Sequence, residues 1–175
     1  MPSDIDKLKT AVEDLQQRLR EESTRRADLE RRCTILEKLA YRDPETGLHT
    51  REYLATRLQE EINRSVRYPS ATTVLTICGR EQSKDEVVRL GQYLSHELRE
   101  SDHVFALKPN SLAILLLETP QEGAKRLVER LQTYLEHFLH GYGYSVTSFP
   151  MDTNVADEFF PLTLERHAKV EATLN

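Results

Sequence analysis

Few side chains in this sequence are spaced for catalysis or for metal binding. A His-x-x-x-His pair beside an acid would suit zinc, but it does not occur among the six histidines: His49, His96, His103, His137, His140 and His167. Cys33 and Cys78 are too few for a disulfide framework or a zinc set. The sequence also lacks a nucleophile elbow for a Ser-His-Asp triad and a glycine-rich phosphate loop. We therefore expect no metal site, no catalytic residue and no cofactor.

The remaining candidates are charged side chains, among them Arg99 and Asp102, which stand three residues apart. On an exposed helix end this spacing gives an ordinary ion pair, worth about 0.2–0.5 kcal/mol. The same spacing recurs at Arg25 and Asp28, so the motif by itself is not specific. The Arg-x-x-Asp motif can be assigned a ligand only from its position within a longer sequence pattern.

The composition excludes several classes of protein. The 175 residues are 38% hydrophobic and 30% charged, with a formal net charge of −5. This excess of acidic residues argues against broad binding to nucleic-acid phosphates, which takes clustered Lys and Arg. The longest apolar run, Leu112–Leu117, is far shorter than the about 18–20 residues of a membrane-spanning helix. With no signal-peptide pattern at the N-terminus, we expect a cytoplasmic protein with no membrane span.

The first forty residues repeat apolar side chains at alternating steps of three and four. Only Glu22 and Arg26 interrupt the repeat, which runs through Ile5, Leu8, Val12, Leu15, Leu19, Leu29, Cys33, Leu36 and Ala40. A 3.5-residue period kept this long is typical of a coiled coil, most simply a parallel dimer. The alternative is a single amphipathic helix packed on its own domain, which normally shows a wider apolar stripe. We predict a coiled-coil dimerisation helix over residues 1–41 and a domain over residues 42–175.

From Arg42 onward the hydrophobic period changes repeatedly. Helices are predicted between Thr50 and Pro69, over Asp85–Arg99, from Pro120 to the glycines at 141 and 143, and over Leu162–Leu174. The first of these should bury Leu54, Leu58, Ile62 and Val66. Strands are predicted at Thr72–Ile77, His103–Leu107, Ser111–Leu117 and Tyr144–Phe149.

From Thr72 the predicted order is therefore βαββαβ, the split βαβ arrangement of ferredoxin-like folds. We predict an α+β domain with this core, with one helix before the core and one after it. The long coiled-coil helix precedes this domain. Such a fold hosts many activities and identifies none of them.

Residues 43–51, Asp-Pro-Glu-Thr-Gly-Leu-His-Thr-Arg, resemble the Asp-x-Leu-Thr-Gly-Leu-x-Asn-Arg signature that opens GGDEF domains, the diguanylate cyclase family. Residues 98–116 resemble the stretch around that family's Gly-Gly-Asp-Glu-Phe hairpin, and residues 144–150 are similar to its last strand. The resemblance covers about residues 39–174 and implies the family's cyclase palm, which has the βαββαβ core. A simple turn, with Asp43 bonded to a backbone amide and a positive φ at Gly47, would explain the first stretch without any family.

The resemblance also implies that catalysis is lost. In the family, an acid at the end of the first strand and an acid in the hairpin hold the metal on the GTP triphosphate. The hairpin positions here are Lys108, Pro109, Asn110, Ser111 and Leu112. A serine thus replaces the acid, and a proline replaces a glycine that allows close backbone approach. The first strand ends in Cys78 and Gly79 without an aspartate, and the segment after it is shorter than in the family.

The same resemblance implies a second site, which binds the family's product, cyclic di-GMP. That site uses an Arg-x-x-Asp just before the hairpin, where Arg99 and Asp102 stand, and an arginine on the following helix, which corresponds to Arg130. A guanidinium donates two bonds to O6 and N7 of guanine, and a carboxylate accepts from N1–H and N2–H₂. The alternative is an ion pair between Arg99 and Asp102 and an ordinary surface arginine at position 130.

We therefore expect a catalytically inactive GGDEF-like signalling protein, a homodimer through its coiled coil, that binds cyclic di-GMP as an effector in bacterial second-messenger signalling. The alternative is a scaffold that binds no nucleotide and docks a protein partner through the coiled coil and the palm.

Overall fold

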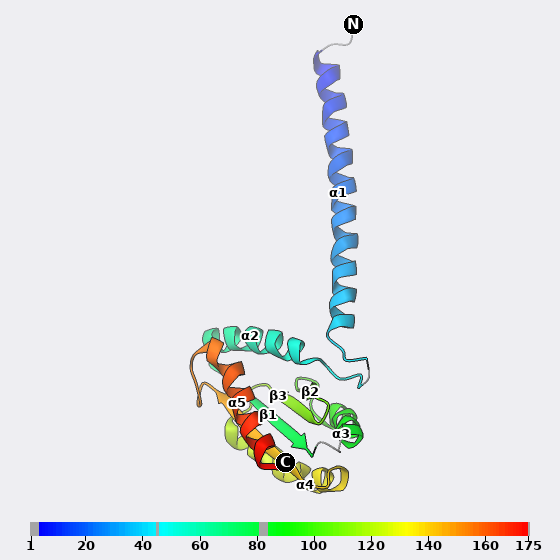
Figure 1. The fold of residues 1–175 in the computed structure, drawn as a ribbon. Coiled ribbons are helices and arrows are strands. Elements are labelled where there is room, and N and C mark those ends of the chain that lie inside the picture. Colours follow the sequence, from blue (N-terminus) through cyan, green and yellow to red (C-terminus); the bar gives the residue numbers. More distant parts are fainter. Residues whose placement is uncertain (1–3, 45, 81–83, 175) are drawn as a thin grey trace. The chain divides into compact units, whose positions relative to one another are not determined.

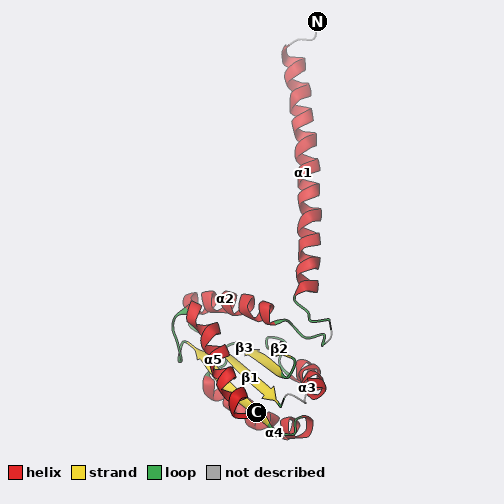
Figure 2. Cartoon of the chain, viewed as in Figure 1, coloured by secondary structure: helices red, strands yellow, loops and turns green. Residues whose placement is uncertain are grey.

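The computed structural model describes residues 4–44, 46–80 and 84–174 (Figure 1). The chain divides into two units, Met1–Ala40 and Tyr41–Asn175. The described part of the first unit is one helix, α1 (Asp4–Ala40). The described part of the second unit has four helices and four strands (Figure 2).

The long helix predicted for the first forty residues is confirmed. Its surface carries ion pairs one turn apart, such as Arg18–Asp14 and Arg32–Asp28, at 2.9 and 3.0 Å. Its large apolar side chains are between 50% and 69% exposed in the single chain: Val12, Leu15, Leu19, Leu29 and Leu36. The coiled-coil pairing of α1 stays a prediction.

The βαββαβ order predicted from Thr72 onward is also confirmed. After α1 come α2 (Arg51–Arg67), β1 (Thr72–Gly79), α3 (Lys84–Glu97), β2 (His103–Lys108), β3 (Ser111–Leu116), α4 (Gln121–Phe138), β4 (Tyr142–Phe149) and α5 (Ala156–Leu174). The four strands form one antiparallel sheet in the order β2-β3-β1-β4. The two central strands are buried along their whole length, which fits their nearly unbroken runs of apolar and β-branched residues.

Helices cover both faces of this sheet, so the core has two layers (Figure 1). On one face, α3 and α4 pack their apolar residues, among them Leu90 and Leu131, against Leu75 of β1 and Ile114 of β3. On the other face, α2 and α5 pack theirs around Val74, Phe105 and Leu115. None of the described helices combines the length and the apolar character that crossing a membrane requires.

The turn that leads into α2 has the geometry that its sequence predicts. The Asp43 carboxylate accepts a hydrogen bond from the Thr46 N–H at 2.7 Å, and Gly47 has a φ of 70°. Thr50 caps α2, since its hydroxyl accepts from the Tyr53 N–H at 3.3 Å. This turn buries Leu48 beneath α3. The Ala106 N–H of β2 donates to the His49 carbonyl at 2.7 Å, which ties the segment before α2 to the sheet.

Several local predictions were wrong. β1 runs two residues past its predicted end, to Gly79, and α3 ends two residues early, at Glu97. Val66 is 73% exposed, because the apolar face of α2 ends at Ile62 and Ser65 takes the next buried position. β4 begins two residues earlier than predicted, with Tyr142 opposite Gly79. α5 begins at Ala156, before Pro161, because its first turns carry Phe159, which is fully buried against Phe149.

Candidate ligand-binding site

Arg99 and Asp102 lie in the short connection between α3 and β2. α3 ends at Glu97, and the Asp102 N–H then donates to the Arg99 carbonyl at 2.9 Å, which closes a tight turn. Arg99 is exposed, whereas Asp102 is half-buried at the start of the sheet. The turn therefore presents the guanidinium to solvent and holds the carboxylate against the domain.

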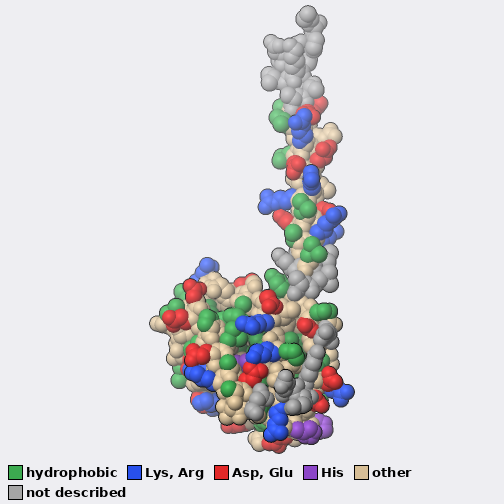
Figure 3. Space-filling model, in the orientation of Figure 1, with side chains coloured by type: hydrophobic (Ala, Val, Ile, Leu, Met, Phe, Trp, Pro, Cys, Tyr) green, Lys and Arg blue, Asp and Glu red, His purple; other side chains and the backbone are tan. Residues whose placement is uncertain are grey.

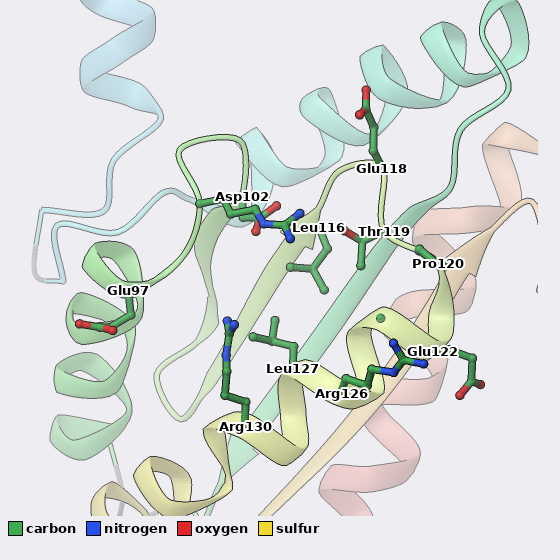
Figure 4. Close-up of a pocket in the computed structure, with 12 residues that line it drawn as sticks. Glu97, Asp102, Leu116, Glu118, Thr119, Pro120, Glu122, Arg126, Leu127 and Arg130 are labelled. Atoms are coloured by element: carbon green, nitrogen blue, oxygen red, sulfur yellow. The ribbon is translucent and has the colours of Figure 1, made fainter.

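A pocket of about 640 Å³ opens between this turn, the segment after β3 and α4. Arg99, Asp102 and Arg130 all line it, so the structure brings together the three residues that the sequence analysis selected. In Figure 4 the side chains of Arg130 and Leu127 rise from α4 toward Leu116 of β3. The volume is within the range that small-molecule sites occupy, about 300–1,000 Å³.

Arg126 also lines this pocket, and the sequence analysis missed it. It stands one helical turn before Arg130, so both side chains project from the same face of α4. The signal was present in the sequence as an i, i+4 pair of arginines beside the buried Leu127. The family resemblance pointed to Arg130 alone.

The pocket carries both signs of charge, with Arg99, Arg126 and Arg130 lining it beside four acidic residues: Glu97, Asp102, Glu118 and Glu122. Within the described parts of the chain, none of Arg99, Arg126 and Arg130 forms an ion pair. Two acids at the pocket's edge are already paired with other cations: Glu118 with Arg64 at 3.1 Å, and Glu122 with Lys125 at 2.8 Å. Three guanidinium groups thus remain available to an anionic ligand.

Asp102 is a half-buried acid of this pocket that can take part in recognition. Burial raises the pKa of its carboxyl above the ordinary value, while a bond from the Leu117 backbone N–H and the charge of Arg99 oppose the rise.

A smaller hollow of about 260 Å³ lies beyond Asp102, lined by Arg42, His49 and His103. Burial lowers the pKa of both histidines. Arg99 and Asp102 line both hollows, so one ligand could reach from one into the other.

The β2–β3 hairpin, where the resemblance implied a metal and a triphosphate, is tied to the rest of the domain instead. Its buried Asn110 donates to the Gly79 carbonyl at 3.1 Å, and the Gly79 N–H donates to the Asn110 carbonyl at 2.9 Å. Ser111 is fully buried, and its hydroxyl lies 3.1 Å from Nε2 of His167 on α5. At the tip, Lys108 pairs with Glu171 of α5 at 2.5 Å.

This arrangement does not suit Mg²⁺. Ser111, at the place of the hairpin acid, pairs with Cys78 near the end of β1, so the two neighbouring side chains offer a hydroxyl and a thiol. Burial raises the pKa of the Cys78 thiol, which favours its neutral form. Hard divalent cations need carboxylate or carbonyl oxygens. Among the residues that the structure describes, no group of three His, Cys, Asp or Glu is placed to hold a metal ion.

Curated proteins and solved structures that resemble this chain are diguanylate cyclases or GGDEF domains. A search against models of known protein families gave no match. Among curated proteins, the chain is 24% identical over 106 residues to the probable diguanylate cyclase DgcJ of Escherichia coli (strain K12). That match covers 54% of this chain and 21% of DgcJ, so the chain spans about a fifth of that relative's length.

Two solved structures illustrate the similarity. The GGDEF domain of DgcB from Caulobacter crescentus, in complex with c-di-GMP, superposes with a TM-score of 0.62 at 8% identity, covering 77% of this chain and 87% of that one. Diguanylate cyclase SiaD from Pseudomonas aeruginosa, in complex with its activator SiaC, gives a TM-score of 0.55 at 22% identity, covering 91% of this chain and 73% of that one. The residues after α1 therefore have the fold of GGDEF domains, the diguanylate cyclase palm.

Proposed function

We propose that this chain is a catalytically inactive GGDEF-like signalling protein that binds cyclic di-GMP in the pocket lined by Arg99, Asp102 and Arg130. The observation that carries the proposal is the convergence of these side chains, from two separate elements, on one pocket. The structure of DgcB in complex with c-di-GMP supports the choice of ligand, because that domain has the same fold.

The chemistry of the pocket suits a guanine dinucleotide. The carboxylate of Asp102 can accept from N1–H and N2–H₂ of guanine, and a guanidinium can donate to O6 and N7. The other arginines can neutralise the two phosphates or stack on a base face. Leu116 and Leu127 supply an apolar wall for the same base.

Loss of cyclase activity follows from the hairpin. Phosphoryl-type transfer needs carboxylates that hold divalent metal on the triphosphate. Here the corresponding positions are neutral, and α5 contacts the hairpin through His167 and Glu171. Incubation of the purified chain with GTP and Mg²⁺ should therefore yield no cyclic di-GMP. Production at the rate of an active cyclase would contradict this part of the proposal.

The proposal includes a homodimer through α1. Ligand in the pocket would then favour one packing of the two domains over another, and α1 would transmit the difference. This requires that cyclic di-GMP bind one packing more tightly than the other.

Isothermal titration calorimetry tests the binding step. Arg99→Ala should weaken cyclic di-GMP binding by roughly tenfold to a hundredfold, because it removes charge-assisted hydrogen bonds worth about 1.5–3 kcal/mol. Arg89→Ala is the matched control, since Arg89 is an exposed arginine of α3 outside the pocket. Equal affinities for the wild type and Arg99→Ala would remove Arg99 from the site.

A scaffold that binds no nucleotide is the second candidate function. The complex of SiaD with its activator SiaC favours it, because that similarity covers 91% of this chain. The absence of heat with both cyclic di-GMP and GTP, from a protein that is folded by circular dichroism, would favour the scaffold.

A further inference from the structure

Two histidines meet in an aromatic cluster beside the segment that follows α1. His49 is the last residue of this segment, residues 41–49, and His103 is the first residue of β2. Their half-buried rings lie 5.9 Å apart, centroid to centroid, with 87° between the ring planes. Tyr53 of α2 and Phe105 of β2 pack around His49 at centroid distances of 4.9 and 5.6 Å. The cluster therefore joins the segment both to α2 and to the sheet.

The backbone of the segment is held at the same place. The Ala106 N–H of β2 donates to the His49 carbonyl at 2.7 Å, and the Thr50 N–H donates to the Tyr41 carbonyl at 2.9 Å. Nδ1 of His49 lies 3.3 Å from that Tyr41 carbonyl. Detachment of residues 41–49 from β2 therefore breaks these bonds and separates the two imidazoles.

The surroundings of the two imidazoles disfavour a proton on either ring. Burial lowers the pKa of both histidines below the ordinary value of 6.5. The positive charges of Arg42 and Arg57 add to the shift at His49, and Arg57 also adds to the shift at His103. A charge on His103 would lower the pKa of His49 further. The closed cluster thus holds both rings neutral.

Groups of the opposite effect are present but already have partners. The carboxylates of Asp102 and Glu61 favour a proton on His103. Glu61 is paired with Arg57 at 2.9 Å, and Asp102 accepts a bond from the Leu117 N–H. The Tyr41 carbonyl favours a proton on His49. Two further charged residues line the hollow beside the rings, one of each sign: Arg99 and Glu100.

We propose that His49 and His103 form a pH-sensitive latch, which holds residues 41–49 against β2 while both rings are neutral and releases them when the rings take up protons. This inference does not depend on the ligand of the proposed function. In the closed latch, two protonated rings would repel each other at 5.9 Å and would lack part of their hydration. In the open latch, each ring takes up its proton in water. Acid therefore favours the open latch.

The latch lies at the covalent link between α1 and the domain, because residues 41–49 connect α1 to α2. Release of this segment would loosen that link while the sheet and the helices packed on it stay folded, as in other local openings of native proteins. The chain would then respond to acidification as to a signal.

Amide hydrogen exchange of the full chain without nucleotide tests the latch. The protection factor compares the observed rate with the intrinsic rate at the same pH, so it removes the direct effect of pH on the exchange chemistry. From about pH 7.5 to about pH 5.5, the protection factors of Thr50 and Ala106 should fall by about tenfold to a hundredfold, since each open ring binds its proton near pH 6.5. The Leu75 amide, at the centre of the sheet, should remain more protected.

Replacement of the two rings tests which groups carry the response. The double variant His49→Phe, His103→Phe keeps two aromatic rings in the cluster and should lose most of the pH response at Thr50 and Ala106. His137→Phe is the matched control and should respond like the wild type, because His137 is exposed on α4. Figure 3 shows histidine side chains at the surface over the end of the domain where α4 lies.

Two outcomes would overturn the inference: protection at Thr50 and Ala106 that does not change with pH in the wild type, or a double variant that keeps the full response. Asp102→Asn separates the effect of the neighbouring acid. The latch predicts that this variant keeps the response, and its loss would assign the response to Asp102. If circular dichroism shows that the double variant is unfolded, His49→Gln takes its place and should lose the share of one histidine, up to about tenfold.

Discussion

The contact between α5 and the hairpin gives a prediction about stability and pH. His167 is 3% exposed, with Nε2 on the Ser111 hydroxyl and no hydrogen-bond partner for Nδ1 among the described residues. Burial lowers the pKa of His167 below its ordinary value of 6.5, although the Glu171 carboxylate opposes the shift. The folded domain therefore holds this imidazole in its neutral form.

The sign of the effect follows from proton linkage. Below about pH 6.5 the unfolded chain binds a proton at position 167 that the folded domain does not bind, so acidification favours unfolding. As the pH decreases below this value, the contribution of one such histidine to the free energy of unfolding decreases by up to about 1.4 kcal/mol per pH unit. At higher pH the contribution does not change with pH. His49 and His103, whose pKa values burial also lowers, add to the slope of the wild type.

His167→Leu removes one of these contributions while keeping a side chain of similar bulk. At about pH 8 the variant should differ from the wild type by only about 1–2 kcal/mol, since it loses the bond to Ser111 but also removes a buried nitrogen without a partner. Acidification from about pH 8 to about pH 5.5 should therefore lower the free energy of unfolding of the wild type by about 1 kcal/mol more than that of the variant.

Urea unfolding at these two pH values, followed by circular dichroism, measures the difference. His137→Leu is the control, because His137 lies exposed on α4. If acidification lowers the free energy of unfolding of the wild type and of His167→Leu equally, the buried neutral imidazole of His167 is not a source of the pH dependence.

Two further predictions concern the pocket and the hairpin. Ligand binding should weaken as the pH falls through the raised pKa of Asp102, because the neutral acid no longer accepts two bonds from guanine. Calorimetry at about pH 7.5 and about pH 5 should show this loss of affinity in the wild type. Asp102→Asn should bind weakly at both pH values. If the affinity of Asp102→Asn changes with pH as much as that of the wild type, another group causes the effect. The double variant Pro109→Gly, Ser111→Asp should make no cyclic di-GMP from GTP and Mg²⁺, and should lose about 1–3 kcal/mol of stability at neutral pH, because it buries a carboxylate beside a neutral histidine. Turnover by that variant, assayed by chromatography of the nucleotides, would show that the hairpin acid alone was missing.

Much of the fold could be predicted from the sequence, because its local signals agree with each other. β1 and β3 are β-branched and apolar runs, and Pro120 and Thr50 stand where α4 and α2 begin. The errors fall where a distant contact overrides the local pattern. Phe159 packs on Phe149 and extends α5 across Pro161, and no periodicity within residues 150–162 indicates that contact.

The candidate site was predictable in part only. Arg99 and Arg130 are far apart in sequence, and only the family resemblance connected them before the structure placed both on one pocket. Arg126 was missed although its spacing from Arg130 is helical. The pair of Ser111 and His167 could not be foreseen, because it joins residues 56 positions apart that belong to no shared motif.

The central claim is that the domain binds cyclic di-GMP at the α3–β2 turn and α4 rather than at the hairpin. Backbone amide shifts in NMR spectra, recorded during titration of the full chain with cyclic di-GMP, test it most directly. We predict shifts at residues 99–102 and 126–130 while residues 108–112 stay unchanged. Shifts confined to residues 108–112, or none from a folded protein at millimolar ligand, would contradict the account.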